Sequence, residues 1–222
     1  MLLGRDEPEP GTEKTSPERE EAARDRRFLV VGLGNPGRRY NNTPHNLGFL
    51  VVDRLAERNG IRVNRKECDA VVGVGRFGPQ AVVLAKPQTY MNRSGPAVKS
   101  LIAKYELGVA DLTLVYDELA LPWTGLRIRF KGSSGGHNGV ESVIHSLGTM
   151  DFARVRLGIH PGHPVSDGKK FVLASFGRAQ KKELDELLDY ASEAVEAMIA
   201  EGVGKAMTKY NRRAFSKEQE EE

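Results

Sequence analysis

Short apolar runs alternate with segments of helical periodicity along most of this 222-residue chain, and this alternation restricts the possible folds more than any other feature. Runs rich in Val, Leu, Ile and Phe are typical of buried or half-buried strands, whereas apolar residues at three- and four-residue spacing are typical of helices. Elements that alternate in this way favour an α/β fold with helices on both faces of one sheet. Strands are expected at 28–33, 70–76, 80–85, 112–117, 126–130 and 154–159, and helices at 46–58, 95–105, 138–147 and 180–200.

The connection between the second and third predicted strands indicates that the sheet is not purely parallel. Phe77-Gly78-Pro79 is a short turn between the apolar runs at 70–76 and 80–85, which is the pattern of a hairpin. The sheet is therefore expected to be mixed. The length of the chain fits one domain, or one domain with an extension.

The two ends of the chain differ in composition from its middle. Residues 1–26 are rich in Pro, Glu and Arg and have almost nothing to bury, so a flexible extension is expected there. A short helix that starts at Ser16 and runs to Arg26 is the alternative. Residues 216–222 form an acidic tail, which leaves 27–215 as the folded domain.

Charge is also distributed unevenly. Residues 1–27 carry a net charge of −2 and residues 216–222 carry −3, so a chain total of +3 leaves +8 on residues 28–215. A basic body is typical of proteins that bind a polyanion. A basic surface that is merely solvated would have the same composition, so charge alone does not decide between the two.

The compartment follows from what the sequence lacks. Cys68 is the only cysteine, which excludes an internal disulfide. No apolar stretch approaches the roughly 18–20 residues that a membrane span needs. The first 27 residues have no apolar core of a signal peptide and contain many acids, unlike a transit peptide. We expect a cytoplasmic protein with no membrane partner.

A glycine-rich turn follows the first predicted strand, in the stretch VVGLGNPGRRYNNTPHNLGF at 30–49. Its glycines do not have the G-x-G-x-x-G pattern of a dinucleotide loop, and the next predicted helix does not begin at them. Pro36 disfavours the α conformation at Asn35. The turn therefore places Asn35 at the carboxyl end of a strand, where ligands of open α/β sheets bind.

Two titratable residues are candidates for acid–base chemistry at strand ends. His45 lies at the start of the predicted helix 46–58 and needs a partner that orients its ring. Asp117 is expected where the run LTLVYD ends, and there it either caps a turn or fixes the tautomer of a histidine. A lone histidine is more often structural than catalytic, and the spacing alone does not pair these two residues.

Three asparagines occupy equivalent places, each between a strand and the next helix. They are Asn35, Asn92 in KPQTYMNRSGPAV and Asn138 in FKGSSGGHNGVESVI. Amide side chains bind peptide-like groups without adding charge, so the three together indicate a peptide or another amide-bearing ligand. Ser94 is a simple candidate for a helix N-cap in the second of these loops.

The sequence offers little support for metal or covalent chemistry. His160 and His163 form a close pair but lack the glutamate of an H-E-x-x-H motif. Ser133 and Ser134 do not lie in a G-x-S-x-G elbow, and Cys68 shows no sign of activation. We expect neither a metal nor a cofactor.

Four separate stretches together resemble bacterial-type peptidyl-tRNA hydrolases. They match the family's motifs in order and spacing over about residues 28–213. The resemblance implies a single α/β domain with a twisted mixed sheet. It also implies hydrolysis of the ester between a peptide and the 3′ ribose of tRNA, which recycles tRNA from peptidyl-tRNA released early by the ribosome. The stretches are VVGLGNPGRRYNNTPHNLGF, KPQTYMNRSG, VYDELALPWTGLRIRFKGSSGGHNGVESVI and FARVRLGIHPGH.

The resemblance also implies roles for individual residues. His45 matches the general base that activates a water molecule, Asp117 the carboxylate that orients this histidine, and Asn35 a catalytic asparagine. The segment 161–176 matches a mobile segment over the crevice. Tyr40, Met91, Asn92 and Asn138 match residues that bind the substrate, and Arg127, Arg129 and Arg156 match basic residues that contact tRNA phosphates.

The periodicity of one strand agrees with a phosphate-binding role. Arg127 and Arg129 alternate with Leu126, Ile128 and Phe130, so both guanidinium groups are expected on one face of the strand. That face is outward if the apolar residues are inward. A plain solvated strand face is the alternative interpretation.

Two other functions remain open from the sequence. One is an RNA-binding relative without hydrolase activity, of the kind that plant organelles use in intron splicing. Intact His45 and Asp117 and the lack of a transit sequence argue against it. The other is an amidohydrolase or peptidase acting on free peptides, against which the basic middle argues weakly. We expect a monomer that acts on peptidyl-tRNA.

Overall fold

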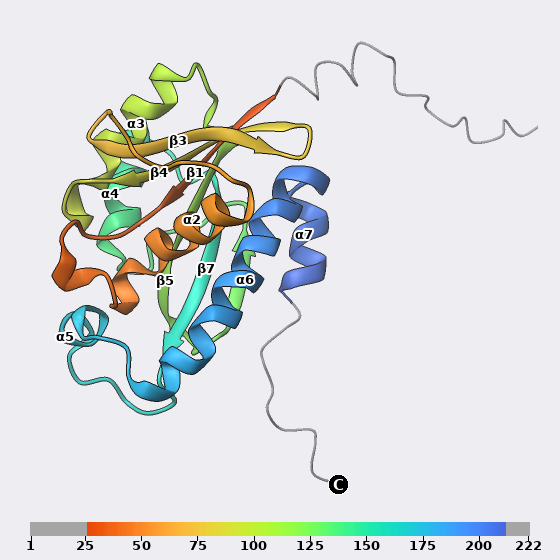
Figure 1. The fold of residues 1–222 in the computed structure, drawn as a ribbon. Helices are drawn as coiled ribbons and strands as arrows, with labels where there is room; N and C mark the ends of the chain where they lie inside the picture. The colour runs from red at the N-terminus through yellow and green to blue at the C-terminus, as the bar shows by residue number, and fades with distance from the viewer. Residues whose placement is uncertain (1–25, 212–222) are drawn as a thin grey trace, which may run out of the picture.

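The computed structural model describes residues 26–211, which form one seven-stranded mixed sheet with helices on both faces (Figure 1). The single α/β domain expected from the sequence is thus confirmed. The expected extension, apart from Arg26, lies outside the described residues, as do the helix considered from Ser16 and the acidic tail. No helix among residues 26–211 is long and apolar enough to cross a membrane.

The elements alternate along the chain much as the apolar pattern indicates. The strands are β1 (Arg27–Gly32), β2 (Arg65–Glu67), β3 (Ala70–Phe77), β4 (Gln80–Pro87), β5 (Leu112–Pro122), β6 (Leu126–Arg129) and β7 (Ala153–His160). The α-helices are α2 (Leu47–Arg58), α3 (Ser94–Lys104), α4 (Asn138–Leu147), α5 (Gly168–Leu173), α6 (Arg178–Glu201) and α7 (Val203–Tyr210). Short 3-10 turns are η1 (Arg38–Tyr40), η2 (Pro44–Asn46), η3 (Met91–Arg93) and η4 (Val109–Asp111).

The strand order across the sheet is β2-β3-β4-β1-β5-β7-β6. The four central strands β4, β1, β5 and β7 are parallel, whereas β2 and β3 on one side and β6 on the other are antiparallel to their neighbours. The expected hairpin is confirmed, because Phe77 pairs with Gln80 across a turn in which Gly78 has a φ of +55°.

Two apolar cores, one on each face, hold the helices to the sheet. The first contains Val30 with side chains of α2 and α6, and the second contains Leu29 and Val31 with side chains of α3 and α4. The central strand β1 is therefore buried on both sides, which explains its unbroken apolar run.

The strand that carries Asp117 extends further than expected. The apolar run stops at Asp117, but β5 continues to Pro122, and its residues after Glu118 are all partly or fully exposed. Regular pairing with β7 ends at Glu118, and the register has shifted by the time Pro122 pairs with His160. The prediction that the strand ends at 117 is wrong, because backbone pairing with β7 resumes at Pro122, beyond the point where the side chains become exposed.

Some short elements have no apolar signal in the sequence. The edge strand β2 has the sequence RKE, and α5 has only six residues, so neither shows a period. The expected strand 126–130 is one residue too long, because β6 ends at Arg129 and Phe130 is 52% exposed.

A close approach of two glycines sets the position of α2. A Cβ atom at Gly48 would overlap the carbonyl oxygen of Val115 and the backbone of Leu33, and one at Gly32 would overlap Gly48 itself. Their missing side chains let α2 start directly against β1 and β5. This close contact between α2 and the two strands thus holds η2, which contains His45, against β5, which contains Asp117.

Candidate active site

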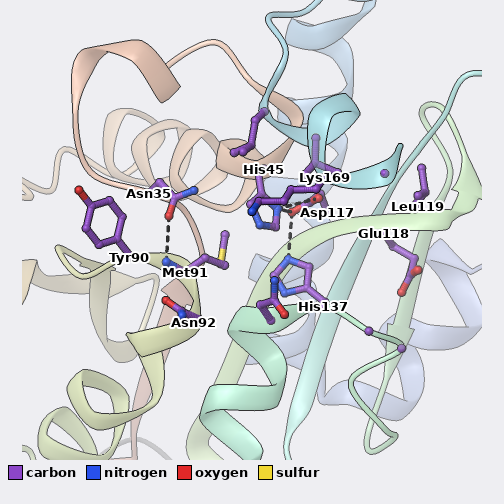
Figure 2. A pocket seen from close by; sticks show the side chains of 16 residues that line it. Asn35, His45, Tyr90, Met91, Asn92, Asp117, Glu118, Leu119, His137 and Lys169 are labelled. Carbon is purple, nitrogen blue, oxygen red and sulfur yellow. Dashed lines mark hydrogen bonds and ion pairs between the residues drawn. The ribbon is translucent and has the colours of Figure 1, made fainter. Parts of the chain in front are cut away.

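A cavity of about 640 Å³ lies at the carboxyl ends of the central strands (Figure 2). Its walls come from the turn after β1, from η2 and η3, from β5, from the start of α4 and from α5. The structure brings most of the predicted site residues together here, since the cavity is lined by Asn35, His45, Met91, Asn92, Asp117 and Asn138.

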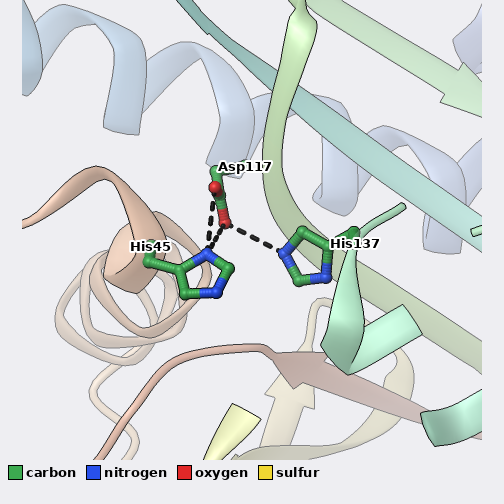
Figure 3. Close-up of side chains that lie close together, drawn as sticks. All are labelled: His45, Asp117 and His137. Carbon is green, nitrogen blue, oxygen red and sulfur yellow. Dashed lines mark hydrogen bonds and ion pairs between the residues drawn. The ribbon is translucent and has the colours of Figure 1, made fainter. Parts of the chain in front are cut away.

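His45 and Asp117 form a buried pair at the centre of the cavity wall. The Nδ1 atom of His45 lies 3.0 Å from Oδ1 and 3.1 Å from Oδ2 of Asp117, and both residues are buried. An ionised carboxylate can only accept, so Nδ1 carries the proton and Nε2 has a free lone pair. Figure 3 shows that Nε2 lies on the side of the ring away from Asp117. This is the arrangement that a general base requires.

A second histidine, His137, shares the same carboxylate, and our sequence-based site did not include it. Its Nε2 atom lies 3.0 Å from Oδ1 of Asp117 (Figure 3). Its Nδ1 atom accepts the backbone N–H groups of Gly139 and Val140, which makes His137 the N-cap of α4. These bonds define a neutral ring with its proton on Nε2. The sequence signal was its place beside Asn138, in a turn between a strand and a helix.

The two histidines determine the protonation of Asp117. Burial on its own would raise the pKa of this carboxyl group, but the field and hydrogen bond of His137 and those of His45 outweigh burial. The pKa of Asp117 is therefore held well below its ordinary value, and the group is ionised at neutral pH. A permanent negative charge next to His45 stabilises the imidazolium that forms when the ring takes a proton.

Asn35 is oriented by hydrogen bonds on both its backbone and its side chain. The N–H of Met91 donates to Oδ1 of Asn35 at 2.8 Å, so the amide nitrogen turns toward the His45 side of the cavity (Figure 2). Asn46 fixes the backbone, because its Oδ1 accepts from the N–H of Asn35 and its Nδ2 donates to the Asn35 carbonyl. Sequence reasoning missed the role of Asn46, which depends on the path of the turn between the two residues.

The other two asparagines and Met91 form the wall opposite α5. Asn92 in η3 and Asn138 at the first position of α4 are exposed to solvent and line the cavity. Met91 is 4% exposed and packs against Gly139, where a Cβ atom would overlap its sulfur. The site therefore combines one buried apolar side chain with amide groups that are accessible to a ligand.

Tyr40 lies outside this group. It belongs to η1, its carbonyl accepts from Thr43, and the Arg39 guanidinium lies 4.6 Å from the centroid of its ring. It is not among the cavity-lining residues. The aromatic side chain on the wall is instead Tyr90, which is 58% exposed and which the sequence did not single out.

The predicted tRNA-binding arginines lie on the neighbouring edge of the sheet and do not line the cavity. Leu126 and Ile128 are fully buried, so Arg127 and Arg129 share the opposite face of β6, as their alternation predicts. Each donates to a main-chain carbonyl of its own strand. Arg127 is paired across the sheet with Arg156.

The arginines of β7 are more constrained than those of β6. Arg154 is 1% exposed and donates to the carbonyls of Ser133 and Met150, so it supports the loop before α4. Arg156 binds one carboxylate oxygen of Glu118 through Nε at 3.0 Å and Nη2 at 2.8 Å. A phosphate would therefore share Arg156 with Glu118, whereas no carboxylate binds Arg127 or Arg129 among residues 26–211.

One group of potential metal ligands coincides with this network. His45, Asp117 and His137 each offer a ligand atom, and these atoms lie within 4.8 Å of one another. The same atoms form the hydrogen bonds described above, so a metal ion there would displace the protons of both rings. In the pair considered from the sequence, Nδ1 of His160 accepts from the N–H of Gly162, and Nδ1 of His163 lies 3.3 Å from the carbonyl oxygen of Pro164.

Comparison with known proteins gives consistent matches over the described domain. Residues 29–220 match the model of a family described as peptidyl-tRNA hydrolase. The chain is 56% identical over 187 residues to the peptidyl-tRNA hydrolase of Solibacter usitatus, covering 84% of this chain and 95% of that protein. It is 41% identical over 186 residues to that of Bacillus subtilis, covering 83% and 98%. The crystal structure of peptidyl-tRNA hydrolase from Acinetobacter baumannii has a TM-score of 0.78 and 32% identity, covering 86% of this chain and 96% of that chain.

Proposed function

The chain belongs to the peptidyl-tRNA hydrolase family, and on this premise we propose that His45 and Asp117 catalyse hydrolysis of the ester between a peptide and the 3′ ribose of tRNA. The products are free tRNA and a peptide with a free carboxylate. The reaction recycles tRNA from peptidyl-tRNA released before translation ends. The observation that carries the mechanism is the buried His45–Asp117 pair, whose free Nε2 atom faces the cavity.

The first step is attack by water. Nε2 of His45 removes a proton from a water molecule as its oxygen attacks the ester carbonyl carbon. The imidazolium that forms is stabilised by ionised Asp117, which His137 also holds in place. The tetrahedral intermediate then collapses, the bond to the ribose oxygen breaks, and the Nε2 proton passes to that oxygen.

Asn35 supplies the donor for the charge that develops on the carbonyl oxygen. Its Oδ1 already accepts from Met91, so its amide N–H groups remain for the substrate. A pre-oriented donor of this kind contributes about 2–4 kcal/mol to stabilisation of the transition state when it is a primary oxyanion contact. The clamp from Asn46 keeps this amide in place before the substrate arrives.

The peptide and the RNA are held by different parts of the molecule. Asn92 and Asn138 bind peptide amide groups at the exposed wall of the cavity, and Met91 covers the apolar side. Arg127 and Arg129 contact phosphates further along the tRNA on the β6 edge, with Arg156 beside them. Tyr40, outside the cavity, shapes the site only indirectly.

The site favours substrates with a blocked amine. Two carboxylates line the cavity, and both are already engaged, Asp117 by two histidines and Glu118 by Arg156. A free α-ammonium group would lose water without gaining a partner, which is costly. A peptidyl or N-acetyl group avoids this cost.

A direct test compares three substrates under the same conditions. We expect fast release of free tRNA from N-acetylaminoacyl-tRNA, much slower release from aminoacyl-tRNA and no cleavage of a free peptide. Binding of tRNA without release would indicate an RNA-binding relative, and cleavage of the free peptide would indicate a peptidase. Equal rates on the blocked and free aminoacyl esters would refute the argument from the engaged carboxylates.

A further inference from the structure

A lysine of α5 borders the cavity beside the proposed catalytic pair. The helix α5 packs against η2, which contains His45, and it turns Gly168, Lys169, Val172 and Leu173 toward the cavity. These positions form one face of the helix, whereas Lys170 lies off this face. Figure 2 shows Lys169 on the same side of the cavity as His45 and Asp117.

The charges of the cavity give Lys169 a distinct position. Among the lining residues it is the only lysine or arginine, and the other charged lining groups are the two carboxylates of Asp117 and Glu118. Both carboxylates have partners, whereas no carboxylate of residues 26–211 pairs with Lys169. The ammonium group is thus a cation without a carboxylate partner among the described residues, in a cavity whose other charged lining residues are carboxylates.

An RNA ligand needs such a cation at this place. The reacting ester is attached to the terminal ribose of tRNA, and the nearest phosphate is the phosphodiester on the 5′ side of the same ribose. When the ester carbonyl lies at His45, this phosphate must lie close to the cavity, where two carboxylates would repel it. A long, flexible lysine side chain next to His45 offsets that repulsion.

We propose that Lys169 binds the terminal phosphodiester of the tRNA acceptor end and thereby holds the ester against His45. The proposal rests on the function proposed above and adds a second phosphate contact, separate from Arg127 and Arg129 on β6. Those arginines lie on another element and do not line the cavity, so they serve phosphates further from the ester.

The test uses two substrates that differ by this phosphate and the cytidine attached to it. One is an N-acetylaminoacyl ester of adenosine, which has no phosphate, and the other is the same ester on cytidylyl-(3′→5′)-adenosine, which has only the terminal phosphodiester. The ratio of kcat/KM for the two esters reports the phosphate contact in each variant. Full-length N-acetylaminoacyl-tRNA shows separately whether the enzyme has the proposed activity at all.

Three variants distinguish a phosphate contact from other roles. Lys169→Met should lower kcat/KM on the dinucleotide ester about tenfold, mainly through KM, and leave the adenosine ester unchanged. Lys169→Arg should keep most of the difference between the two esters. Lys170→Met removes the same charge one position away and should change neither ester, with thermal unfolding measured for all variants.

The other outcomes are equally clear. If Lys169→Met slows both esters alike, the lysine acts on the ester or supports α5, and the proposal fails. If it changes neither ester, or if Lys170→Met has the same effect, the lysine is only a solvated charge and the proposal also fails. If wild-type protein does not release N-acetylaminoacyl groups from full tRNA, it is the proposed function that fails.

Discussion

At the scale of single residues, the site depends on one carboxylate that serves two histidines. Asp117 accepts from His45 and from His137, and the second of these also caps α4. The proposed general base is therefore coupled to the start of a helix and to the β5 backbone. A buried carboxylate that accepts hydrogen bonds from two rings holds the His45 ring in one orientation, as a catalytic group requires.

The protonation of Asp117 gives a prediction about stability in acid. Its pKa is lower in the folded than in the unfolded protein, so its ionisation stabilises the fold above the ordinary aspartate value of about 4. This contribution is lost as the pH falls from there toward the folded-state pKa. We expect Asp117→Asn to unfold more easily than wild type at about pH 6, with the gap narrowing steadily as the pH falls below about 4. A gap of constant size in thermal unfolding over this range would contradict the argument.

The clamp on Asn35 gives a second prediction at this scale. Asn46→Ala leaves the buried N–H and carbonyl of Asn35 without partners, which costs about 1–3 kcal/mol of stability. Looser positioning of the Asn35 amide should also reduce kcat at least tenfold with a smaller change in KM. The control Asn59→Ala removes an asparagine on the far end of α2 and should leave kcat unchanged. A normal kcat for Asn46→Ala would show that the clamp is only structural.

The sequence identifies several residues that line the cavity but not the residues that hold them in place. Asn35, Asn92 and Asp117 carry a chemical signal at or after an apolar run, and His45 carries one at the start of a predicted helix. The roles of Asn46 and His137 depend on contacts between separate segments. Tyr40 was chosen by resemblance alone, and its distance from the cavity could not be derived from the local sequence.

At the scale of elements, close packing of α2 on the sheet positions His45, the proposed general base. Gly48 lies within α2, where alanine would usually be favoured over glycine by about 1 kcal/mol. Here the added methyl group meets backbone atoms of β5 and of the turn after β1, which cannot move aside. The geometry of the site is therefore built into the contact between a helix and two strands.

Substitution of this glycine tests the element directly. Gly48→Ala should destabilise the protein by about 1–3 kcal/mol and reduce kcat, because α2 and η2 must shift away from Asp117. Gly204→Ala in α7 is the matched control, since a Cβ atom there has only an ordinary contact with Phe130 at 3.9 Å. It should be neutral or stabilising by up to about 1 kcal/mol. Similar unfolding curves for the two variants would refute the role given to this contact.

The elements themselves were predictable where burial is regular. The central strands and the long helices follow their apolar patterns to within one or two residues at most ends. The extension of β5 beyond Asp117 was not predictable, because the residues of its outer part are all at least partly exposed and its register with β7 shifts. The short helix α5 contributes one wall of the cavity from only six residues, too few for a periodic signal.

At the scale of the whole molecule, the cavity and the proposed phosphate-binding arginines are separate. The cavity lies at the carboxyl ends of the central strands, whereas Arg127 and Arg129 occupy the β6 edge of the sheet. The double variant Arg127→Ala/Arg129→Ala should raise KM for N-acetylaminoacyl-tRNA with little change in kcat. Each lost phosphate contact should also reduce the slope of log K against log salt by roughly 0.7–0.9.

The opposite edge of the sheet provides the control for this prediction. Lys66 in β2 and Arg62 just before it are both exposed. Arg62→Ala/Lys66→Ala therefore removes the same charge at the opposite edge strand of the sheet from β6. It should leave KM and the salt slope close to wild type. If the two double variants behave alike, net charge and not a specific contact explains tRNA binding.

The central claim is that His45 activates water with the help of Asp117, and the turnover of His45→Ala tests it most directly. With saturating N-acetylaminoacyl-tRNA, we expect kcat to fall by roughly 10²–10⁴ while tRNA affinity stays near wild type and the protein remains folded. Asp117→Asn should also be slow, because an amide can stabilise the wrong tautomer of His45. Turnover of His45→Ala close to that of wild type would contradict the account.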